Sequence, residues 1–369
     1  PGGWEYREDW ASGSRAAAHG GVTTVIDMPN CIPPTNTLSA LQKKRLAASK
    51  NSLVNYGFFF GTGNAGDARA AKNIAGIKMF LGDSTGNLSV RKNTEENTET
   101  YFDLASKINK PLCVHAEDQA CLKKSKEIAR AEDITDHSLV RPPECALPAT
   151  KYALDTAVKK KTRLHVCHVT LSQEMQEIEL AKKAGGKITC EVTPHHLFLS
   201  EEDARQSENP NFFKVNPPLR SKHDQAALWH AITDGVVDLI SSDHAPHGLR
   251  EKQTDYWQAP AGIAGIETML ALLLNAVNEK KISLERVVEL TSLNPAKVFK
   301  IKGKGAIEKG FDADLTLIDL RRELRVRGDE FYSKAKFTPF EGRRLQGWPV
   351  ATIVGGKIVF TQNSFVESL

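Results

Sequence analysis

The chain has 369 residues, of which 40% are hydrophobic and 25% charged, and its formal net charge is +4. This length fits two domains, or one barrel of roughly 250 residues with a small appendage. Basic and acidic residues are interspersed, which disfavours nucleic-acid binding, and the longest apolar runs fall far short of the ~20 residues that cross a bilayer. We therefore expect a cytoplasmic protein with neither a nucleic-acid partner nor a membrane span.

Short apolar runs alternate with helical stretches along the first 300 residues. The pattern predicts seven strands, at 22–28, 54–60, 76–81, 111–115, 163–169, 187–193 and 238–242. Helices are expected at 9–19, 38–49, 94–108, 149–160, 171–184, 224–233, 265–278 and 283–300. Nearly continuous apolar strands are typical of a parallel sheet or barrel that is covered on both faces. The fold expected is α/β, a (β/α)8 TIM-like barrel of which this chain supplies seven strands.

After residue 300 the sequence pattern changes to short predicted strands separated by glycines, at 314–319 and 351–362. Within the second range, Gly355-Gly356 indicates a hairpin turn. We divide the chain into a hydrolase barrel over residues 1–300 and the C-terminal part of a small β-sandwich domain over residues 301–369. Within the barrel, the polar and proline-rich composition of segment 133–148 makes it a candidate mobile segment.

Six cysteines are scattered singly, with no C-x-x-C pair that would indicate a zinc knuckle or redox motif. They are Cys31, Cys113, Cys121, Cys145, Cys167 and Cys190. A chain of this size does not need disulfides to compensate for a small core, so we expect most of them to be core thiols in a reducing compartment.

Four chemistry-bearing residues lie near the ends of separate predicted strands: Lys78, His115, His168 and Asp243. Functional side chains of a barrel project from these carboxyl ends, and imidazole and carboxylate are zinc ligands. A lysine can join them only if its amine is neutral and carries a carboxylate from carbon dioxide, which burial favours by lowering the pKa. Taken alone, each histidine is more simply explained as a hydrogen-bonded core or loop residue. The lysine alone is more simply explained as a side chain that reaches solvent or pairs with an acid. Together they predict a divalent-metal site.

Three further residues are candidates for substrate binding. Asn30 ends the segment Asp27-Met28-Pro29-Asn30, and Asn216 opens Asn-Pro-Pro-Leu-Arg. His247 follows Asp243 by four residues, in a turn that can point it back into the barrel mouth. For the two asparagines, an ordinary turn or a rigid loop is the alternative explanation.

These residues fall within motifs that resemble those of the dihydroorotases of the amidohydrolase superfamily, in the same order and over essentially the whole chain. The motifs are residues 27–30 (DMPN), 76–78 (GIK), 114–118 (VHAED), 165–168 (HVCH), 216–220 (NPPLR), 243–247 (DHAPH), 262–268 (GIAGIET) and 338–342 (TPFEG).

The resemblance implies a zinc-dependent cyclic amide hydrolase that reversibly closes N-carbamoyl-L-aspartate to dihydroorotate in pyrimidine biosynthesis. It implies two Zn²⁺ ions bridged by carboxylated Lys78, with His115 and His168 on the second ion. Asp243 would be a ligand of the first ion and the proton shuttle. Asn30 and His247 would bind the substrate carboxylate, Asn216 would contact the pyrimidine ring, and His165 would be a packing or supporting residue.

The family motif D-x-H-x-H-x-R-E-P-G of the first barrel strand is matched only in its last two letters, by Pro1-Gly2. The resemblance therefore implies that the first strand is missing, and that a protein of these residues alone binds less zinc and is inactive. The alternatives are another cyclic amidase, such as an allantoinase or hydantoinase, or an inactive structural homologue. Aspartate transcarbamoylase is a candidate partner, and the sequence leaves the oligomeric state open.

Overall fold

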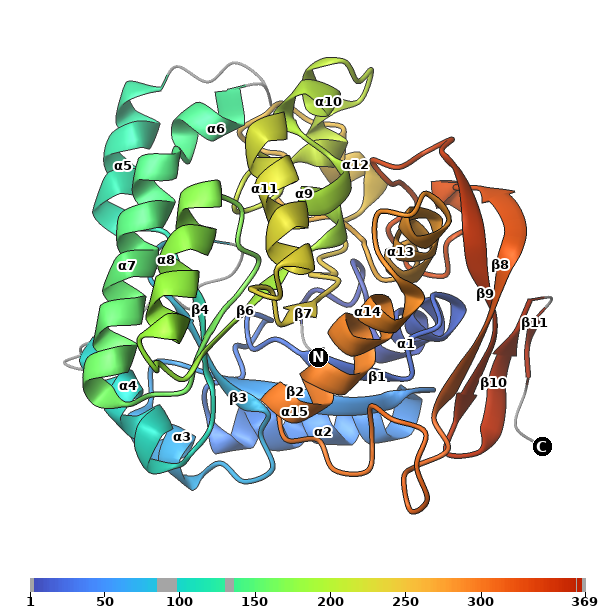
Figure 1. Cartoon of the computed structure of the whole chain (residues 1–369), viewed down its shortest axis with the longest axis horizontal. Coiled ribbons are helices and arrows are strands. Elements are labelled where there is room, and N and C mark those ends of the chain that lie inside the picture. Colours follow the sequence, from blue (N-terminus) through green and yellow to red (C-terminus); the bar gives the residue numbers. More distant parts are fainter. Residues whose placement is uncertain (1–2, 85–97, 130–135, 363, 367–369) are drawn as a thin grey trace.

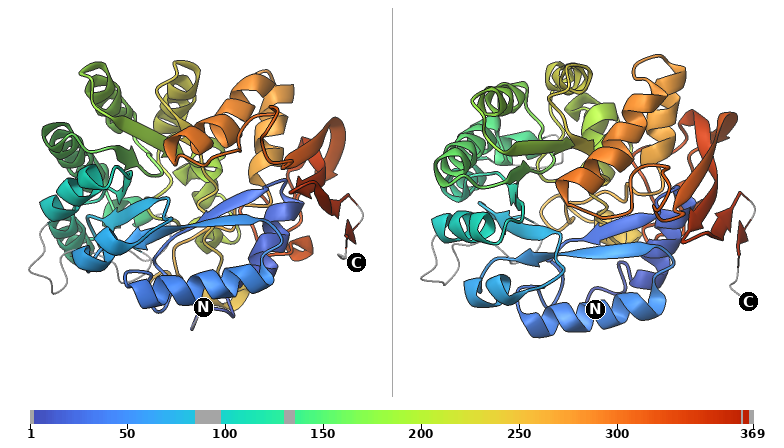
Figure 2. Two further views of the ribbon diagram at one scale, coloured as in Figure 1. Left: turned by 90° about the horizontal axis from the view of Figure 1, so that it is seen from below. Right: turned by 60° about the horizontal axis from the view of Figure 1, so that its bottom comes forward.

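The computed structural model describes residues 3–84, 98–129, 136–362 and 364–366. Its centre is a curled parallel sheet in which seven strands follow one another in chain order (Figures 1 and 2). The strands are β1 (Thr24–Asp27), β2 (Asn55–Gly61), β3 (Gly76–Phe80), β4 (Leu112–His115), β5 (Leu164–Val166), β6 (Ile188–Val192) and β7 (Leu239–Ile240). All seven predicted strands are confirmed, and with them the barrel-like α/β fold.

Helices cover the outer side of this sheet, as Figure 2 shows from two directions. Those that correspond to predicted helices are α1 (Trp10–His19), α2 (Leu38–Asn51), α4 (Thr98–Lys107), α7 (Pro143–Lys160), α8 (Ser172–Lys183), α11 (Lys222–Thr233), α13 (Met269–Asn278), and α14 (Leu284–Val288) with α15 (Asn294–Val298). The first residues of the helix expected at 94–108, up to 97, lie outside the described residues. The short helices α3 (Ala65–Ala70), α5 (Gln119–Ile128), α6 (His137–Val140), α9 (Pro194–Phe198), α10 (Glu201–Arg205) and α12 (Leu249–Lys252) were not expected.

The core lies between the sheet and these helices. Every residue of β3 and β4 is buried, and Ile77, Met79, Leu112 and Val114 are completely excluded from solvent. Strands with apolar side chains on both faces need cover on both sides, which explains their continuous hydrophobic sequence. This packing fixes the strand ends, where the chemistry-bearing residues lie.

A separate antiparallel sheet follows, in the order β11-β10-β9-β8. Its strands are β8 (Leu315–Arg325), β9 (Arg344–Val354), β10 (Lys357–Thr361) and β11 (Ser364–Phe365). Gly355 and Gly356 have φ of 56° and 79° between β9 and β10, as the tight hairpin turn requires. The sheet packs against α1 and α13, where Thr352 donates to the carbonyl of Ala18. The small β domain is confirmed, while its boundary at residue 300 stays a prediction.

In the region of α5 to α7, the expectation that Cys121 and Cys145 are free thiols is wrong, while the mobility of residues 133–148 stays a prediction. The segment 136–148 is mostly helical, and α7 begins at Pro143, a position where the missing N–H costs no hydrogen bond; residues 133–135 lie outside the described part. Cys121 and Cys145 form a disulfide, because α5 and α7 bring their Cα atoms within 5.3 Å. Three of the remaining cysteines are buried thiols, as expected, and the fourth is half-buried: Cys113, Cys167, Cys190 and Cys31, respectively.

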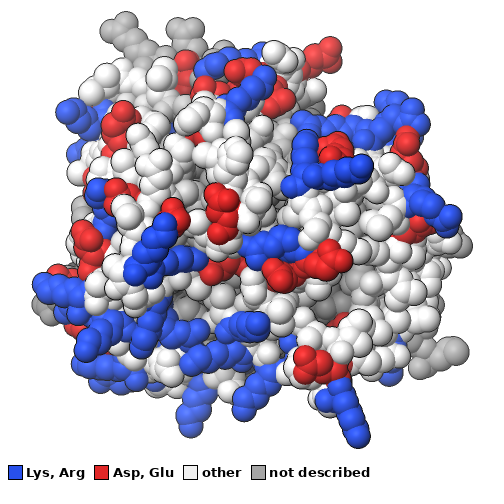
Figure 3. All heavy atoms as spheres, viewed as in Figure 1, with Lys and Arg blue, Asp and Glu red and all other residues white. Residues whose placement is uncertain are grey.

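Lysine and arginine gather toward the lower edge of the face drawn in Figure 3, where Figure 1 places α2, α3 and α15. Several helices carry lysine in their last turn, among them Lys50 in α2, Lys107 in α4 and Lys297 in α15. Cations there complement the negative end of the helix dipole, which gives these charges a structural role. None of the helices in the described ranges is long and apolar enough to cross a bilayer.

Candidate functional site

The four predicted metal ligands lie toward the carboxyl ends of four strands of the parallel sheet. Lys78 lies within β3, His115 ends β4, His168 follows β5 by two residues and Asp243 follows β7 by three. His168 and Asp243 have φ of 37° and 41°. Non-glycine residues adopt this left-handed region rarely, and such strain concentrates at functional sites. The fold thus gathers the predicted ligands at one edge of the sheet.

His115 and His168 face each other. His115 Nδ1 lies 3.1 Å from His168 Nε2, and His115 Nε2 lies 2.7 Å from Glu117 Oε2. Burial lowers the pKa of both imidazoles, which keeps them neutral, so each ring has a single N–H. Since His115 donates from Nε2 to the carboxylate, its Nδ1 presents a lone pair to His168. Two nitrogens bound to one tetrahedral zinc ion lie roughly 3.3 Å apart, so this pair fits a metal.

Glu117 holds His115 in this orientation. The carboxylate is completely buried and accepts hydrogen bonds from Arg141, whose Nε lies 3.1 Å from Oε2 and 3.2 Å from Oε1. Burial alone would raise the pKa of Glu117, but Arg141 and His115 outweigh it and hold this pKa well below its usual range. A carboxylate behind a ligating histidine fixes the tautomer and makes the ring a better ligand. The sequence analysis missed Glu117, although its place two residues after a predicted ligand was a signal.

Lys78 contacts Cys167 in the structure, rather than the other predicted metal ligands. Its Nζ donates to Cys167 Sγ at 3.0 Å, inside the sheet, and the side chain is buried. Burial lowers the pKa of Lys78, but the charge and hydrogen bond of Cys167 outweigh it and raise the pKa above the ordinary value. The expectation that burial would lower this pKa is therefore wrong for the free amine. Carboxylation must displace the proton that Cys167 stabilises.

Asp243 lies beside a histidine that the sequence analysis gave no role. Its Oδ2 is 4.0 Å from His195 Nε2. Burial raises the pKa of Asp243 to about 7, against the opposing charge of Lys78. His195 is fully buried, and neither ring nitrogen has a hydrogen-bond partner in the described part of the chain. A carboxyl group that titrates near neutrality suits proton transfer.

A second cluster of potential ligands lies deeper in the sheet. Donor atoms of His165, Cys167 and Glu191 lie within 4.8 Å of one another, and across the described residues this is the only group of three or more His, Cys, Asp or Glu so close together. Its donors are already engaged. His165 Nε2 lies 3.0 Å from Glu191, and Cys167 accepts from the ammonium of Lys78. A neighbouring cation disfavours a metal here, so this cluster fits a supporting role.

Asn216 is positioned by a buried histidine of α6. His137 Nε2 lies 3.0 Å from Asn216 Oδ1, and His137 Nδ1 lies 2.7 Å from the hydroxyl of Tyr256. Burial lowers the pKa of His137 to about 3, so the ring is neutral and donates from Nε2 to the amide oxygen. The amide nitrogen of Asn216 is thereby turned away from His137. The sequence carried no signal for this contact, because the two residues are 79 positions apart.

His247 lies in the loop after β7 and is buried. Its Nε2 lies 3.0 Å from the carbonyl oxygen of Ala261, to which it must donate, while Nδ1 is buried without a partner in the described structure. Burial, with the charges of Lys252 and Arg7, lowers the pKa of His247 to about 3. The neutral ring therefore presents a lone pair, and it can donate to a carboxylate only after taking up a proton.

Asn30 lies in the loop after β1, which is anchored by a buried lysine of α2. Lys44 Nζ lies 2.5 Å from Asp27 Oδ2 and donates to the carbonyl of Met28 at 2.7 Å. Burial would lower the pKa of Lys44, but Asp27 outweighs it and raises this pKa. Lys44 therefore fixes the loop that carries Asn30.

The chain is similar to known proteins over nearly its whole length. Residues 5–359 match the amidohydrolase family. Similar curated proteins include the dihydroorotase of Methanosarcina acetivorans, 38% identical over 98% of this chain and 79% of the relative. The dihydroorotase of Pyrococcus abyssi is likewise 38% identical, over 98% of this chain and 80% of its own length.

Solved structures with the same fold belong to related cyclic amidases. The L-hydantoinase (dihydropyrimidinase) of Arthrobacter aurescens superposes with a TM-score of 0.93 at 30% identity, covering 99% of this chain and 83% of that one. The dihydropyrimidinase of Brevibacillus agri gives a TM-score of 0.90 at 26% identity, over 98% of this chain and 81% of the other.

Proposed function

The chain belongs to the amidohydrolase family and, within it, to the dihydroorotases, and from this premise we propose that it catalyses the reversible cyclisation of N-carbamoyl-L-aspartate to dihydroorotate. The observation that carries the proposal is the pair of neutral imidazoles, His115 and His168, whose nitrogens meet at 3.1 Å. The identity to curated dihydroorotases supports the choice of substrate.

The metal proposed for this site is zinc, in two ions. His115 and His168 would hold one ion, Asp243 the other, and carboxylated Lys78 would bridge them. Bound zinc polarises a carbonyl group and lowers the pKa of water toward ~7. The imidazoles of His115 and His168 and the carboxylate of Asp243 match the donor set that zinc prefers. His168 Nδ1 and both ring nitrogens of His195 are buried without a partner in the described structure.

Asp243 is the proposed general base and acid. With a pKa of about 7, its carboxylate is available to accept a proton from the attacking water in the hydrolytic direction. Oδ2 then returns the proton to the leaving ring nitrogen. In the direction of synthesis the same group removes a proton from the carbamoyl nitrogen and delivers it to the departing oxygen.

Asn216, His247 and Asn30 are the proposed substrate contacts. Because His137 occupies the amide oxygen of Asn216, the amide N–H groups of Asn216 can donate to a ring carbonyl. His247, once protonated, can donate from Nδ1 to the substrate carboxylate while Nε2 stays bonded to Ala261. Asn30 offers an amide at the end of β1.

A hydantoinase is the second candidate function, because the solved hydantoinase of Arthrobacter aurescens matches nearly the whole chain. The substrates differ in their exocyclic carboxylate, which dihydroorotate carries and unsubstituted hydantoin lacks. A structural homologue without activity is disfavoured, since a purely structural role does not require the predicted metal ligands His115, His168 and Asp243 at strand ends of one sheet. A partnership with aspartate transcarbamoylase and a cytoplasmic location stay predictions.

The test is turnover of a substrate panel by a zinc-loaded protein that carries the family's D-x-H-x-H-x-R-E-P-G segment as well as these residues, because these residues alone are expected to be inactive. We expect dihydroorotate and N-carbamoyl-L-aspartate to interconvert with a kcat/KM at least about 100-fold above that for hydantoin or allantoin, the discrimination available when buried polar groups are left unpaired by the wrong substrate. Turnover of hydantoin or allantoin alone would reject the proposal.

A further inference from the structure

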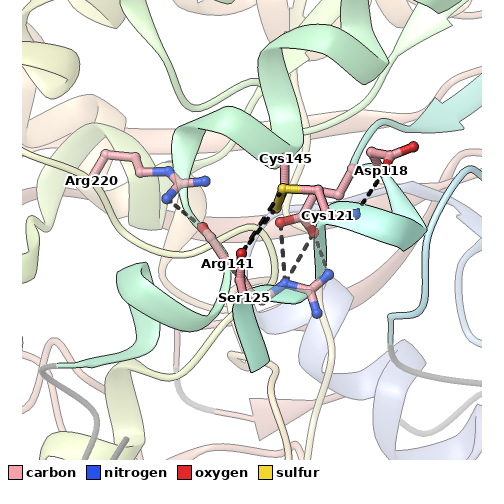
Figure 4. The surroundings of a disulfide bond; sticks show 7 residues. Asp118, Cys121, Ser125, Arg141, Cys145 and Arg220 are labelled. Carbon is pink, nitrogen blue, oxygen red and sulfur yellow. Dashed lines mark hydrogen bonds and ion pairs between the residues drawn. A yellow bond between two sulfur atoms is a disulfide. The ribbon is translucent and has the colours of Figure 1, made fainter. Parts of the chain in front are cut away.

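The disulfide between Cys121 and Cys145 lies close in sequence to Glu117 and Arg141, the pair that orients His115, and Figure 4 shows it beside Arg141 and Asp118. Cys121 is the third residue of α5 and Cys145 the third residue of α7. Each cysteine follows one member of that pair by four residues: Cys121 follows Glu117, and Cys145 follows Arg141. The covalent bond therefore joins the two chain segments that bring Glu117 and Arg141 together.

Three links between these segments lie in succession. Arg141 binds the buried carboxylate of Glu117. One residue further on, the backbone N–H of Asp118 donates to the carbonyl of Cys145 at 2.7 Å. Asp118 also caps α5 by accepting from the N–H of Cys121 at 2.8 Å. The disulfide closes the series, four residues beyond Glu117 and Arg141 along each segment.

The far side of Arg141 is held as well. Arg220 donates from Nη1 to the carbonyl of Arg141 at 2.7 Å, and Arg141 donates from Nη2 to the carbonyl of Asp83. Arg141 is thus fixed through its backbone and its side chain. Among the described residues, the disulfide is the one covalent cross-link between the side chains of these two segments.

We propose that the Cys121–Cys145 disulfide is a redox-reactive site for dithiol reductants, and that it braces Glu117 and Arg141 so that His115 keeps its metal-binding orientation. This inference rests on the proposed function, because it assigns His115 to the metal. The reacting partner is a small or protein-borne dithiol. The oxidised form is the form with the higher affinity for zinc.

The two sulfurs differ in access, which sets the order of the reaction. Cys145 is completely buried, whereas Cys121 is partly exposed. A thiolate of the reductant attacks Sγ of Cys121, the S–S bond breaks, and Cys145 leaves as a thiolate that takes up a proton. The second thiol of the reductant then attacks the mixed disulfide and releases Cys121. Two electrons and two protons pass to the protein, and the reductant becomes a disulfide.

The experiment compares the oxidised, the dithiol-reduced and the reoxidised protein. Thiol titration in denaturant verifies the state, with four thiols expected when oxidised and six when reduced. Hydrogen exchange of the metal-free protein is followed at the amide of Asp118, whose hydrogen bond to Cys145 joins the two segments, and at the amides of Cys121 and Cys145, which carry the disulfide. Zinc affinity is measured by competition with a chelator.

We expect reduction to speed exchange at these three amides by about tenfold, as local opening becomes easier, and to weaken zinc binding by about tenfold, the loss typical for a disturbed outer-shell partner. Reoxidation restores both. In Glu117→Gln, zinc binding is already weaker and reduction weakens it no further. Arg141→Lys gives the same pattern, so the test does not depend on one variant. The double variant Cys121→Ser, Cys145→Ser behaves as the reduced protein, and dithiols change neither its amide exchange nor its zinc affinity.

Cys190→Ala is the matched control. It removes a buried free thiol from β6 and leaves the disulfide in place, so reduction changes its exchange and zinc affinity as in the wild type. Unchanged exchange after verified reduction overturns the brace, and so does an equal loss of zinc affinity in wild type and Glu117→Gln. If neither redox state binds zinc, the proposed metal site fails, and the exchange rates still decide whether the disulfide braces these segments.

Discussion

The Nδ1 atom of His115 lies 3.1 Å from the Nε2 atom of His168, with Glu117 behind the first ring. Burial keeps both imidazoles neutral, and because His115 gives its Nε2–H to Glu117, its Nδ1 accepts a hydrogen bond from Nε2–H of His168. A metal ion bound by both nitrogens would take the place of that proton. This relationship has consequences that can be measured.

Loss of either imidazole should abolish tight zinc binding. For His168→Asn we expect the affinity to fall by more than about 100-fold, beyond the 10–100-fold typical for outer-shell partners, because a ligand itself is removed. Metal analysis after dialysis against a weak chelator measures the effect. His223→Asn, which changes an exposed histidine of α11, should retain the wild-type zinc content. Equal zinc content in both variants would refute the assignment.

Lys78 should be needed as a carboxylated side chain. We expect Lys78→Ala to lower kcat by at least on the order of 100-fold, the size of effect seen when one preorganised charge-stabilising group is lost. Short carboxylic acids should restore part of the activity by supplying the missing carboxylate. Intact-mass measurement should also find one added carbon dioxide in the wild type and none in the variant. Unchanged zinc content and turnover in Lys78→Ala would show that the lysine only packs against Cys167.

The pH dependence of stability should carry the signature of His137. Its pKa is about 3 in the fold, against 6.5 for an ordinary histidine, so the stabilisation is complete above pH 6.5 and is lost as the pH falls toward 3. At pH 5 the loss amounts to about 2 kcal/mol. Urea unfolding at pH 7 and pH 5 measures it. His137→Gln, which cannot titrate, should lose about 2 kcal/mol less over this interval; parallel losses in both proteins would contradict the account.

Substrate binding should be accompanied by proton uptake at His247. The neutral ring donates to Ala261 and presents only a lone pair at Nδ1, so a bound carboxylate requires the imidazolium. Calorimetry at pH 7.5 with a non-hydrolysable analogue that bears the same carboxylate, in two buffers of different ionisation enthalpy, counts the protons. We expect an uptake that approaches one proton and disappears in His247→Asn. The same count in both proteins would remove His247 from the carboxylate site.

The seven strands could be predicted from the sequence because a buried parallel strand has apolar side chains on both faces. Its sequence is therefore a local apolar run, such as those that end at His115 and Val166. The sequence also predicted the residues at the carboxyl ends of the strands, since strand order alone brings them to one edge. The helix α6 escaped prediction because four residues are too few to show a period. α5 also escaped prediction, although its ten residues equal those of α1, which was predicted.

The contacts that tune the site could not be predicted locally. Glu117 with Arg141, Cys121 with Cys145, and His137 with Asn216 join residues 24, 24 and 79 positions apart. These pairs exist only because the loops and helices above the sheet fold against one another. The partner of Lys78 in the structure, Cys167, is another such case, and it reverses the pKa shift that burial alone would give.

The most direct test of the metal centre is anomalous X-ray scattering at the zinc edge from crystals of the zinc-loaded protein. The account predicts a peak between His115 Nδ1 and His168 Nε2, within about 2.0–2.1 Å of both nitrogens. A peak confined to His165, Cys167 and Glu191, or none between the two facing imidazoles, would contradict it.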